Sequence, residues 1–232
     1  MESNAPKQNT NRRAFIGTLA TGAAAMTLGS LAAPLQSIAN ENQFPADDDP
    51  DAWFNKIKGK HRIVFDATEP NGVFPFAWPR VFLMTNTMTG TPEKDSSVVV
   101  VLRHNAIPFA MNSSLWTKYN FGEVFHVKDD STKASAVRNA FWQPKKGDFN
   151  IPGVGEVAIG INELQDSGVM FCVCNVALTV YSAAVAQGMN KNAADVRKDW
   201  VDGLLPGIQV VPSGVWALGR AQEKNCGYIF AG

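Results

Sequence analysis

The side chains best suited to chemistry follow short apolar runs of this 232-residue chain. Cys174 ends the run that begins at Val169, and His104 lies just after the run Ser97–Leu102. A thiol at the point where a buried strand ends and a helix begins faces unpaired backbone N–H groups, which favour a thiolate. Such a thiolate could attack a polysulfide or thiosulfonate sulfur and hold the product as a persulfide. His104 would then be a polar partner that polarises or protonates the ligand.

The same residues also fit a purely structural interpretation. Cys172 and Cys174 lie in an apolar stretch, and free cysteines are commonly buried as small core residues. In an extended strand their Cα atoms would be about 6.5–7 Å apart, which is unfavourable for a disulfide. Cys226 precedes the last apolar run and is expected to be unpaired. A histidine at a strand end is likewise often a hydrogen-bonded structural residue.

Short apolar runs alternate with helix-like stretches along the chain. The predicted strands are His61–Asp66, Ser97–Leu102, Val169–Cys174, Ile208–Pro212 and Tyr228–Phe230. The predicted helices are Trp78–Met88, Pro108–Tyr119, Val157–Gln165, Ala177–Gln187, Ala193–Leu204 and Val215–Lys224. The second strand is continuously apolar and mostly β-branched, which is typical of a strand buried on both faces. The alternation predicts an α/β domain with a mostly parallel five-stranded sheet and helices on both faces.

Ligands of open parallel sheets bind at the carboxyl ends of the strands. The residues after the predicted strands therefore form the candidate site, which adds Asn175, Ser213 and Gly214 as ligand-binding residues. Phe76, in the aromatic segment after the first strand, is expected to line an apolar mouth, with a packed loop as the alternative.

Other classes of site lack a motif in this chain. There is no glycine-rich phosphate loop, no paired-carboxylate signature and no Gly-x-Ser-x-Gly elbow, so we expect neither a nucleotide-binding protein nor an ordinary hydrolase. The three histidines are scattered, and Met84, Met88 and Met111 have no ligand spacing. The sequence therefore predicts no metal and no cofactor.

The first 39 residues are typical of an export signal. A polar leader precedes Arg12 and Arg13, which are followed at once by Ala14-Phe15-Ile16 and then by a mild apolar run. This order resembles a twin-arginine signal peptide, which predicts the export machinery as a partner and the periplasm as the destination. The small residues Ser37 and Ala39 suit cleavage after Ala39, so no stable membrane span is expected afterwards. An uncleaved anchor is the alternative.

The remaining chain is predicted to form one domain. Residues 40–59 are polar and predict a solvated tether, and residues 60–232 predict the α/β domain, with a long insertion at about 128–155. The leader holds three basic residues and one acidic residue, so the neutral full chain becomes a mature chain of net charge near −2. A chain with that charge lacks the excess of basic residues that is typical of nucleic-acid-binding proteins.

Four segments carry a resemblance to a known family: Val100–His104, Val169–Asn175, Gly207–Gly214 with its Val-Pro-Ser-Gly, and Gly227–Ile229. Together they are similar to the DsrE/DsrF-like family of sulfur-relay proteins, over most of residues 60–232. The resemblance implies a flavodoxin-like three-layer sandwich, small homo-oligomers, and a cysteine, here Cys174, that carries sulfane sulfur as a persulfide. This chain departs from the family pattern in three ways: it has the insertion, it has the export signal, and it has Asn105 where the family often has glycine.

Two functions remain open at this point. The first is an exported periplasmic carrier in which Cys174 performs sulfur transfer, with a sulfur donor or acceptor protein as its partner. The second is a non-catalytic periplasmic protein that binds a small ligand or takes part in assembly on the same fold. The first function requires an accessible Cys174, whereas the second tolerates its burial.

Overall fold

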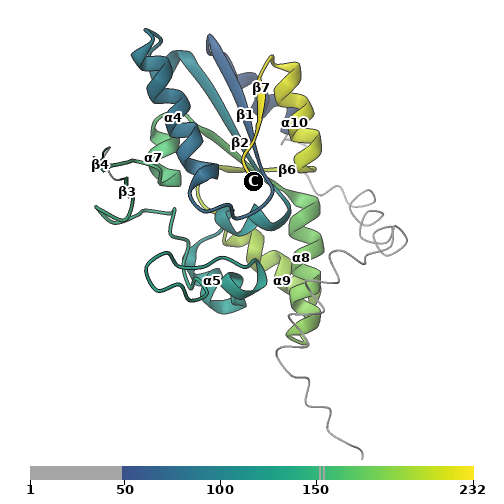
Figure 1. Ribbon diagram of the computed structural model, residues 1–232. Helices are drawn as coiled ribbons and strands as arrows, with labels where there is room; N and C mark the ends of the chain where they lie inside the picture. The colour runs from purple at the N-terminus through teal and green to yellow at the C-terminus, as the bar shows by residue number, and fades with distance from the viewer. Residues whose placement is uncertain (1–48, 152, 154) are drawn as a thin grey trace, which may run out of the picture.

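A five-stranded sheet forms the centre of the computed structural model, which describes residues 49–151, 153 and 155–232. Its strands are β1 (His61–Ala67), β2 (Ser96–Leu102), β5 (Met170–Cys174), β6 (Ile208–Val211) and β7 (Gly227–Phe230). They lie in the order β6-β5-β2-β1-β7, and every neighbouring pair is parallel (Figure 1). The predicted α/β fold with a mostly parallel sheet is thereby confirmed. The export-signal residues Arg12, Arg13 and Ala39 lie outside the described residues.

Both faces of the sheet are buried, because successive side chains of its apolar runs alternate between them. Val98, Val100 and Leu102 pack in the larger hydrophobic core on one face, and Val99 and Val101 pack in a smaller core on the other. Helices α4 (Phe74–Met88), α7 (Ile161–Asp166), α8 (Asn175–Gly188) and α9 (Ala193–Asp202) contribute to the larger core. Helices α3 (Pro50–Trp53) and α10 (Gly214–Glu223) contribute to the smaller core. The result is a three-layer sandwich.

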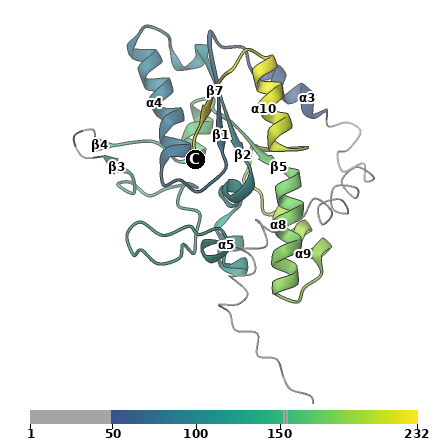
Figure 2. The same ribbon diagram turned by 45° about the vertical axis from the view of Figure 1, so that its right-hand side comes forward.

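The path of the chain explains which helices cover which face. From β1 through β2 and β5 to β6 the chain crosses the sheet in one direction, and it then returns to place β7 beside β1. Right-handed crossovers that run in opposite directions put their helices on opposite faces. Therefore α10, between β6 and β7, lies on the face opposite to α8 and α9. Figures 1 and 2 show α5 (Ser113–Tyr119), α8 and α9 beyond the carboxyl ends of the strands.

Two helices begin at positions that the sequence pattern does not predict. Helix α4 starts earlier, at Phe74, because Pro75 occupies its first turn, where no N–H donor is needed. The predicted helix Pro108–Tyr119 divides into a 3-10 segment, η3 (His104–Ala110), and α5, which begins after Asn112 because that side chain accepts two N–H groups. Within the described residues, the remaining helical segments are η1 (Phe54–Lys56), η2 (Glu93–Asp95) and α6 (Phe121–Val124). No helix in the described part of the chain is long and apolar enough to cross a membrane.

Part of the tether predicted for residues 40–59 is instead packed on the domain. Helix α3 begins at Pro50 and leads into η1, and Trp53, Phe54 and Ile57 are buried in the smaller core. Phe54 meets the ring of Trp216 from α10 edge-on, with centroids 5.7 Å apart. These apolar side chains cover sheet surface beside α10, so the packed domain begins earlier than its polar flanking residues suggest.

The insertion at 128–155 is anchored to the larger core. Phe141 stacks on Phe76 with ring centroids 4.1 Å apart. The side-chain amide of the buried Asn139 donates to the carbonyl oxygens of Phe109 and Met111, at 2.8 and 3.0 Å. The insertion also contains two short antiparallel strands, β3 (Asn150–Ile151) and β4 (Gly155–Glu156).

Candidate functional site

The carboxyl ends of β5 and β6 mark the point where the chain reverses its direction across the sheet. Strand β5 leads into α8 on one face, and β6 leads into α10 on the other. In open parallel sheets, ligands bind at such a switch point because the two connections diverge from it. Cys174 and Asn175 lie at the first strand end, and Ser213 and Gly214 at the second, so the fold brings these four residues to one edge.

Cys174 is the residue that joins β5 to α8. Its sulfur accepts a hydrogen bond from the Ala177 N–H at 3.3 Å and thereby caps the helix. Backbone donors and the positive end of a helix dipole stabilise negative charge at this position. Cys174 is 6% exposed and belongs to the larger hydrophobic core, so a ligand can reach its sulfur only if the residues around it move.

The surroundings of the two other cysteines are less favourable for a thiolate. All three cysteines are free thiols. Cys172 points into the smaller core without exposed surface, and burial raises the pKa of its thiol strongly. Burial also raises the pKa of Cys226, to about 11, although the charge of Arg62 lowers it in part. Neither thiol is therefore suited to act as a nucleophile near neutral pH.

Arg103 and Cys174 each follow the last paired residue of two neighbouring strands. Leu102 of β2 pairs with Val173 of β5, so Arg103 and Cys174 follow as the next residues in the parallel register. Arg103 donates from Nε and Nη2 to the two carboxylate oxygens of Asp66, at 2.6 and 2.9 Å. The Tyr228 hydroxyl donates to the same carboxylate at 2.8 Å. Three strands thus contribute to one polar cluster at the carboxyl edge.

The charges of this cluster act on one another. The hydrogen bond to Asp66 is the main cause of the raised pKa of the Arg103 guanidinium, and burial opposes it in part. The negative charge of an ionised Cys174 also raises that pKa, so the guanidinium and the sulfur attract each other electrostatically.

The residues after β6 hold Arg103 in place. Gly214 lies so close that a Cβ atom there would be 2.6 Å from Cδ and 2.7 Å from Cβ of Arg103. The Ser213 side chain caps α10 by accepting the Trp216 N–H at 3.2 Å. The close approach of Gly214 means that the start of α10 packs directly on the arginine side chain.

Asn175 lies at the site but its side chain faces α9. It is 1% exposed, and its side-chain oxygen accepts a hydrogen bond from Arg197 Nη2 at 2.6 Å. This contact fastens the first turn of α8 to α9, beside Cys174. The structure therefore gives Asn175 a positioning role at the start of the helix.

His104 belongs to a second polar network at the same edge. Its Nδ1 lies 3.0 Å from one carboxylate oxygen of Glu69, and the other oxygen accepts from the Asn105 amide at 2.8 Å. The Tyr181 hydroxyl of α8 donates to Asn105 at 2.6 Å. Burial raises the pKa of Tyr181 to about 12, with the charge of Glu69 as a further cause. His104 has a φ of 51°, a backbone conformation that is uncommon outside glycine.

The sequence analysis misplaced one site residue and missed three. Phe76 has no exposed surface and packs against Phe141 and Phe109, so it is a core residue and lines no opening. The aromatic segment after β1 formed a helix, α4, which turns this ring into the core. Asp66, Arg103 and Tyr228 were missed. A charged residue at the end of a predicted buried strand was the available signal for Asp66, since such charges are rarely left unpaired.

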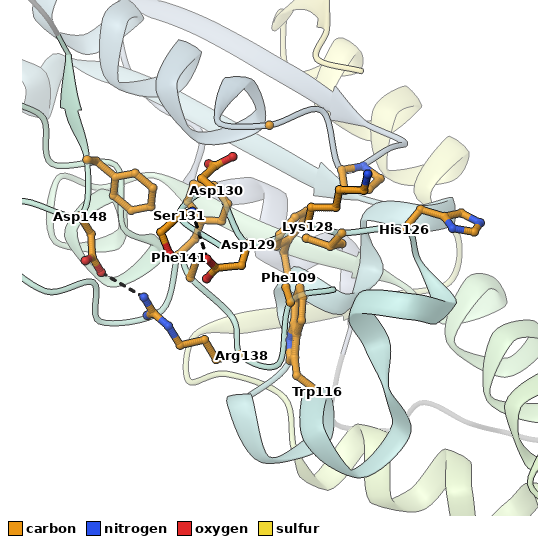
Figure 3. A pocket seen from close by; sticks show the side chains of 16 residues that line it. Phe109, Trp116, His126, Lys128, Asp129, Asp130, Ser131, Arg138, Phe141 and Asp148 are labelled. Atoms are coloured by element: carbon orange, nitrogen blue, oxygen red, sulfur yellow. Dashed lines mark hydrogen bonds and ion pairs between the residues drawn. The ribbon is translucent and has the colours of Figure 1, made fainter. Parts of the chain in front are cut away.

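A separate cavity of about 340 Å³ lies between the loop after β1 and the insertion. Figure 3 shows the aromatic rings of Phe109, Trp116 and Phe141 together with charged side chains such as Lys128 and Asp129 around it. Neither Cys174 nor Arg103 lines this cavity.

Across the described residues, no group of three or more histidine, cysteine or acidic residues is arranged to hold a metal ion.

No family model and no curated protein matches this chain. The solved structure of a protein of unknown function from Methanobacterium thermoautotrophicum is similar to it, with 20% sequence identity and a TM-score of 0.35. That alignment covers 74% of this chain and 99% of the other. The chemistry of the site itself therefore carries the functional interpretation.

Proposed function

We propose that this protein is an exported DsrE-like sulfur carrier that holds sulfane sulfur as a persulfide on Cys174. The observation that carries the proposal is the hydrogen bond from the Ala177 N–H to the Cys174 sulfur at the start of the 14-residue helix α8. A sulfur anion there gains a backbone donor and the positive end of the helix. Because a persulfide is also an anion, the same groups would hold the loaded form.

The transfer step balances without an oxidant. With a thiosulfonate donor, the Cys174 thiolate forms a bond to the outer sulfur, and the bond between that sulfur and the sulfonyl sulfur breaks. The sulfinate leaves with the electron pair, so the products are one persulfide anion and one sulfinate anion. Attack of an acceptor thiolate on the outer sulfur of the persulfide then releases the Cys174 thiolate.

The burial of Cys174 limits the donors that suit this step. Because Cys174 is 6% exposed, we propose small, slender donors such as polysulfide or thiosulfonate, which need the least movement of the surrounding residues to reach the sulfur. A protein thiol would need the surrounding loops to move before it could reach the sulfur. Small inorganic or organic sulfur compounds are therefore the proposed donors.

Intact-mass measurement after exposure to polysulfide tests the carrier function. The wild-type protein is expected to gain mass in steps of one sulfur atom and to lose it on reduction. Cys174→Ser should abolish the gain, while Cys172→Ser and Cys226→Ser, which remove the two thiols with raised pKa values, should keep it. Absence of any gain in the wild type, or an equal gain in Cys174→Ser, would overturn the proposal.

The proposal places the carrier in the periplasm, reached by the twin-arginine route. Replacing Arg12 and Arg13 by lysine should leave uncleaved precursor in the cytoplasm, because the arginine pair is the element that the export machinery recognises. Fractionation and N-terminal sequencing would show this. Mature periplasmic protein of unchanged amount from the double-lysine variant would contradict the assignment.

The carrier is further proposed to form a small homo-oligomer through the β7 edge. Strand β7 pairs with β1 alone within the described sheet. Its side chains Tyr228, Ile229 and Phe230 are 47%, 38% and 54% exposed. Unpaired strand edges and large exposed apolar side chains support association with another chain.

Binding of a small ligand without catalysis is a second candidate function, and the cavity beside the insertion favours it. Its aromatic base and charged surroundings suit a ligand with an apolar ring and a charged group. Titration with an anionic naphthalene dye should show saturable binding that Ala140→Trp, which fills the cavity, weakens at least about tenfold. Equal affinity of the two proteins would exclude this cavity as the binding site.

A further inference from the structure

We propose that the cavity beside the insertion binds an aromatic zwitterion, with the ion pair between Arg138 and Asp148 holding its two charges. This inference rests on the second candidate function, ligand binding in that cavity, and names the ligand class: a small molecule, such as an aromatic α-amino acid, that carries an ammonium and a carboxylate group beside a ring. Both side chains line the cavity, and a dashed line joins them in Figure 3. The volume of about 340 Å³ is near the lower end of the range for small-molecule sites, about 300–1,000 Å³, so it suits one compact ligand.

The ion pair keeps one donor side and one acceptor side unused. Arg138 donates from Nη2 to Oδ2 of Asp148 at 3.4 Å. Among the described residues, no hydrogen bond uses Nε or Nη1 of Arg138, and none uses Oδ1 of Asp148. The two side chains are 42% and 28% exposed. A ligand carboxylate can therefore bind Arg138, and a ligand ammonium can bind Asp148, while the pair itself stays in place.

Neighbouring hydrogen bonds hold both charged residues in place. Arg138 precedes Asn139, whose buried side-chain amide donates to two backbone carbonyl oxygens of the larger core, at 2.8 and 3.0 Å. Asp148 closes a turn with Lys145. The Lys145 N–H donates to Oδ2 of Asp148, and the Asp148 N–H donates to the Lys145 carbonyl oxygen, each at 3.0 Å. Charged groups positioned in this way lose little conformational freedom when a ligand binds.

Aromatic rings follow this ion pair in the chain and line the same cavity. Phe149 comes directly after Asp148, and its ring stacks on Phe141 with centroids 5.0 Å apart and 8° between the planes. Phe141 meets Phe109 edge-on at 5.4 Å, and both of these rings are buried. Phe149 is only partly buried. A ligand ring can therefore join this cluster, since aromatic pairs are favourable at centroid distances of about 4.5–7 Å.

The charges around the cavity favour a ligand with both signs. The lining contains two positive side chains, Lys128 and Arg138, and three negative ones, Asp129, Asp130 and Asp148. An anionic ligand would meet the three carboxylates, and a cationic ligand would meet the lysine and the arginine. Like charges placed opposite each other oppose binding. A zwitterion gives each sign a partner, so it should bind more tightly than a compound with the same ring and one charge.

Isothermal titration with three compounds that share an indole ring tests the inference. Tryptophan carries both charges, tryptamine lacks the carboxylate, and indole-3-propionate lacks the ammonium. The wild type should bind tryptophan at least about tenfold more tightly than either single-charge compound. Equal affinities for the three compounds, or no binding of tryptophan, would overturn the inference.

Two variants should change this selectivity in opposite directions. Arg138→Met removes the partner of the carboxylate, so tryptophan should lose its advantage over tryptamine and keep its advantage over indole-3-propionate. Asp148→Asn should do the reverse. Both variants should fold, because an exposed ion pair contributes little to stability. Since both break the same pair, a purely structural role would weaken binding of all three compounds by one factor in each variant, and that result would overturn the inference.

A matched control removes a positive charge from the insertion without changing the cavity. Lys133 is 74% exposed and does not line the cavity, so Lys133→Met should keep the wild-type selectivity. Ala140→Trp, which fills the cavity, should weaken the binding of tryptophan at least about tenfold. Equal affinity of the wild type and Ala140→Trp for tryptophan would place the ligand elsewhere and overturn the inference.

The outcomes separate this inference from the functions proposed above. If the anionic dye binds in the cavity but tryptophan has no advantage over the single-charge compounds, ligand binding stands and the zwitterion inference fails. If neither the dye nor tryptophan binds, both fail. Sulfur gain at Cys174, which does not line the cavity, is measured separately by mass and depends on neither result.

Discussion

The guanidinium of Arg103 and the carboxylate of Asp66 meet through two hydrogen bonds, of 2.6 and 2.9 Å, at the carboxyl ends of two adjacent strands. The pair is asymmetric in burial, since Asp66 is 1% exposed and Arg103 27%. A carboxylate without its partner would be held away from water, whereas a guanidinium without its partner can still be hydrated. The two residues should therefore contribute unequally to the stability of the fold.

A double-mutant cycle in urea tests this asymmetry. Arg103→Met should lower the free energy of unfolding by about 3–5 kcal/mol, because it leaves a buried charge unpaired. Asp66→Asn should cost less, about 1–3 kcal/mol, and the double variant should be more stable than Arg103→Met alone. Glu223→Ala, which breaks an exposed pair with Arg220, is the control and should cost less than about 1 kcal/mol. Additive losses in the cycle would contradict the coupling.

Two glycines of α10 provide a matched pair of alanine substitutions. Gly214→Ala would bring a Cβ within 2.7 Å of Arg103 Cβ, an atom fixed to the backbone, so we expect a loss of about 1–3 kcal/mol. Gly219 has open space around the same position, and Gly219→Ala should raise the free energy of unfolding by up to about 1 kcal/mol through helix propensity. Thermal unfolding of both variants would show whether the two substitutions change the stability in opposite directions. Equal effects would mean that the close approach of Gly214 is unimportant.

Val99→Asp tests the burial of β2 on both faces. Val99 has no exposed surface and packs in the smaller core. An unpaired charge there costs several kcal/mol, which is comparable to the whole stability of a domain, about 5–15 kcal/mol. Val137→Asp is the control, since Val137 is 67% exposed. Soluble Val99→Asp protein with an unchanged melting temperature would reject the structure of this strand.

These three sets of variants rest on features that the sequence predicts to different degrees. The apolar run at Ser97–Leu102 predicted β2 closely, because a short, continuous and β-branched apolar run is typical of a strand buried on both faces. The contact of Asp66 with Arg103 was not predictable in the same way. It depends on β1 and β2 being neighbours in register, and that order is a property of the whole sheet.

The location of the candidate site followed from fold class, whereas its internal contacts did not. Cys174 and Gly214 were predicted to lie at the ends of strands, where parallel sheets generally bind their ligands. The role of Gly214 against Arg103 comes from packing between segments distant in the chain. Trp53, Phe54 and Ile57 were misassigned to a tether, because these three apolar residues in a short polar stretch give no periodic pattern.

Asp129 gives a pH-dependent prediction in the insertion. Hydrogen bonds from the Ser131 hydroxyl and from Thr132 lower the pKa of its exposed carboxyl group to about 2. Because the pKa in the folded state is depressed, the turn is stabilised above the ordinary aspartate pKa and loses that stabilisation as the pH falls through about 2. Carboxyl NMR should show Asp129 still ionised at about pH 4, where ordinary aspartates are about half protonated. Ser131→Ala should raise its pKa, and an unshifted midpoint in the wild type would contradict the turn.

The exposed edge of the sheet gives the last prediction, on self-association. Ile229 lies in β7, whose other side has no strand neighbour among the described residues, and Phe230 beside it is 54% exposed. If copies of the chain associate through this edge, Ile229→Lys places a charge in the interface and should shift the protein towards the monomer in analytical ultracentrifugation. Val215→Lys is the matched control, since Val215 is 66% exposed on α10, away from the β7 edge. A wild type that sediments as a monomer at all concentrations, or an equal shift in the two variants, would exclude the β7 edge as the site of association.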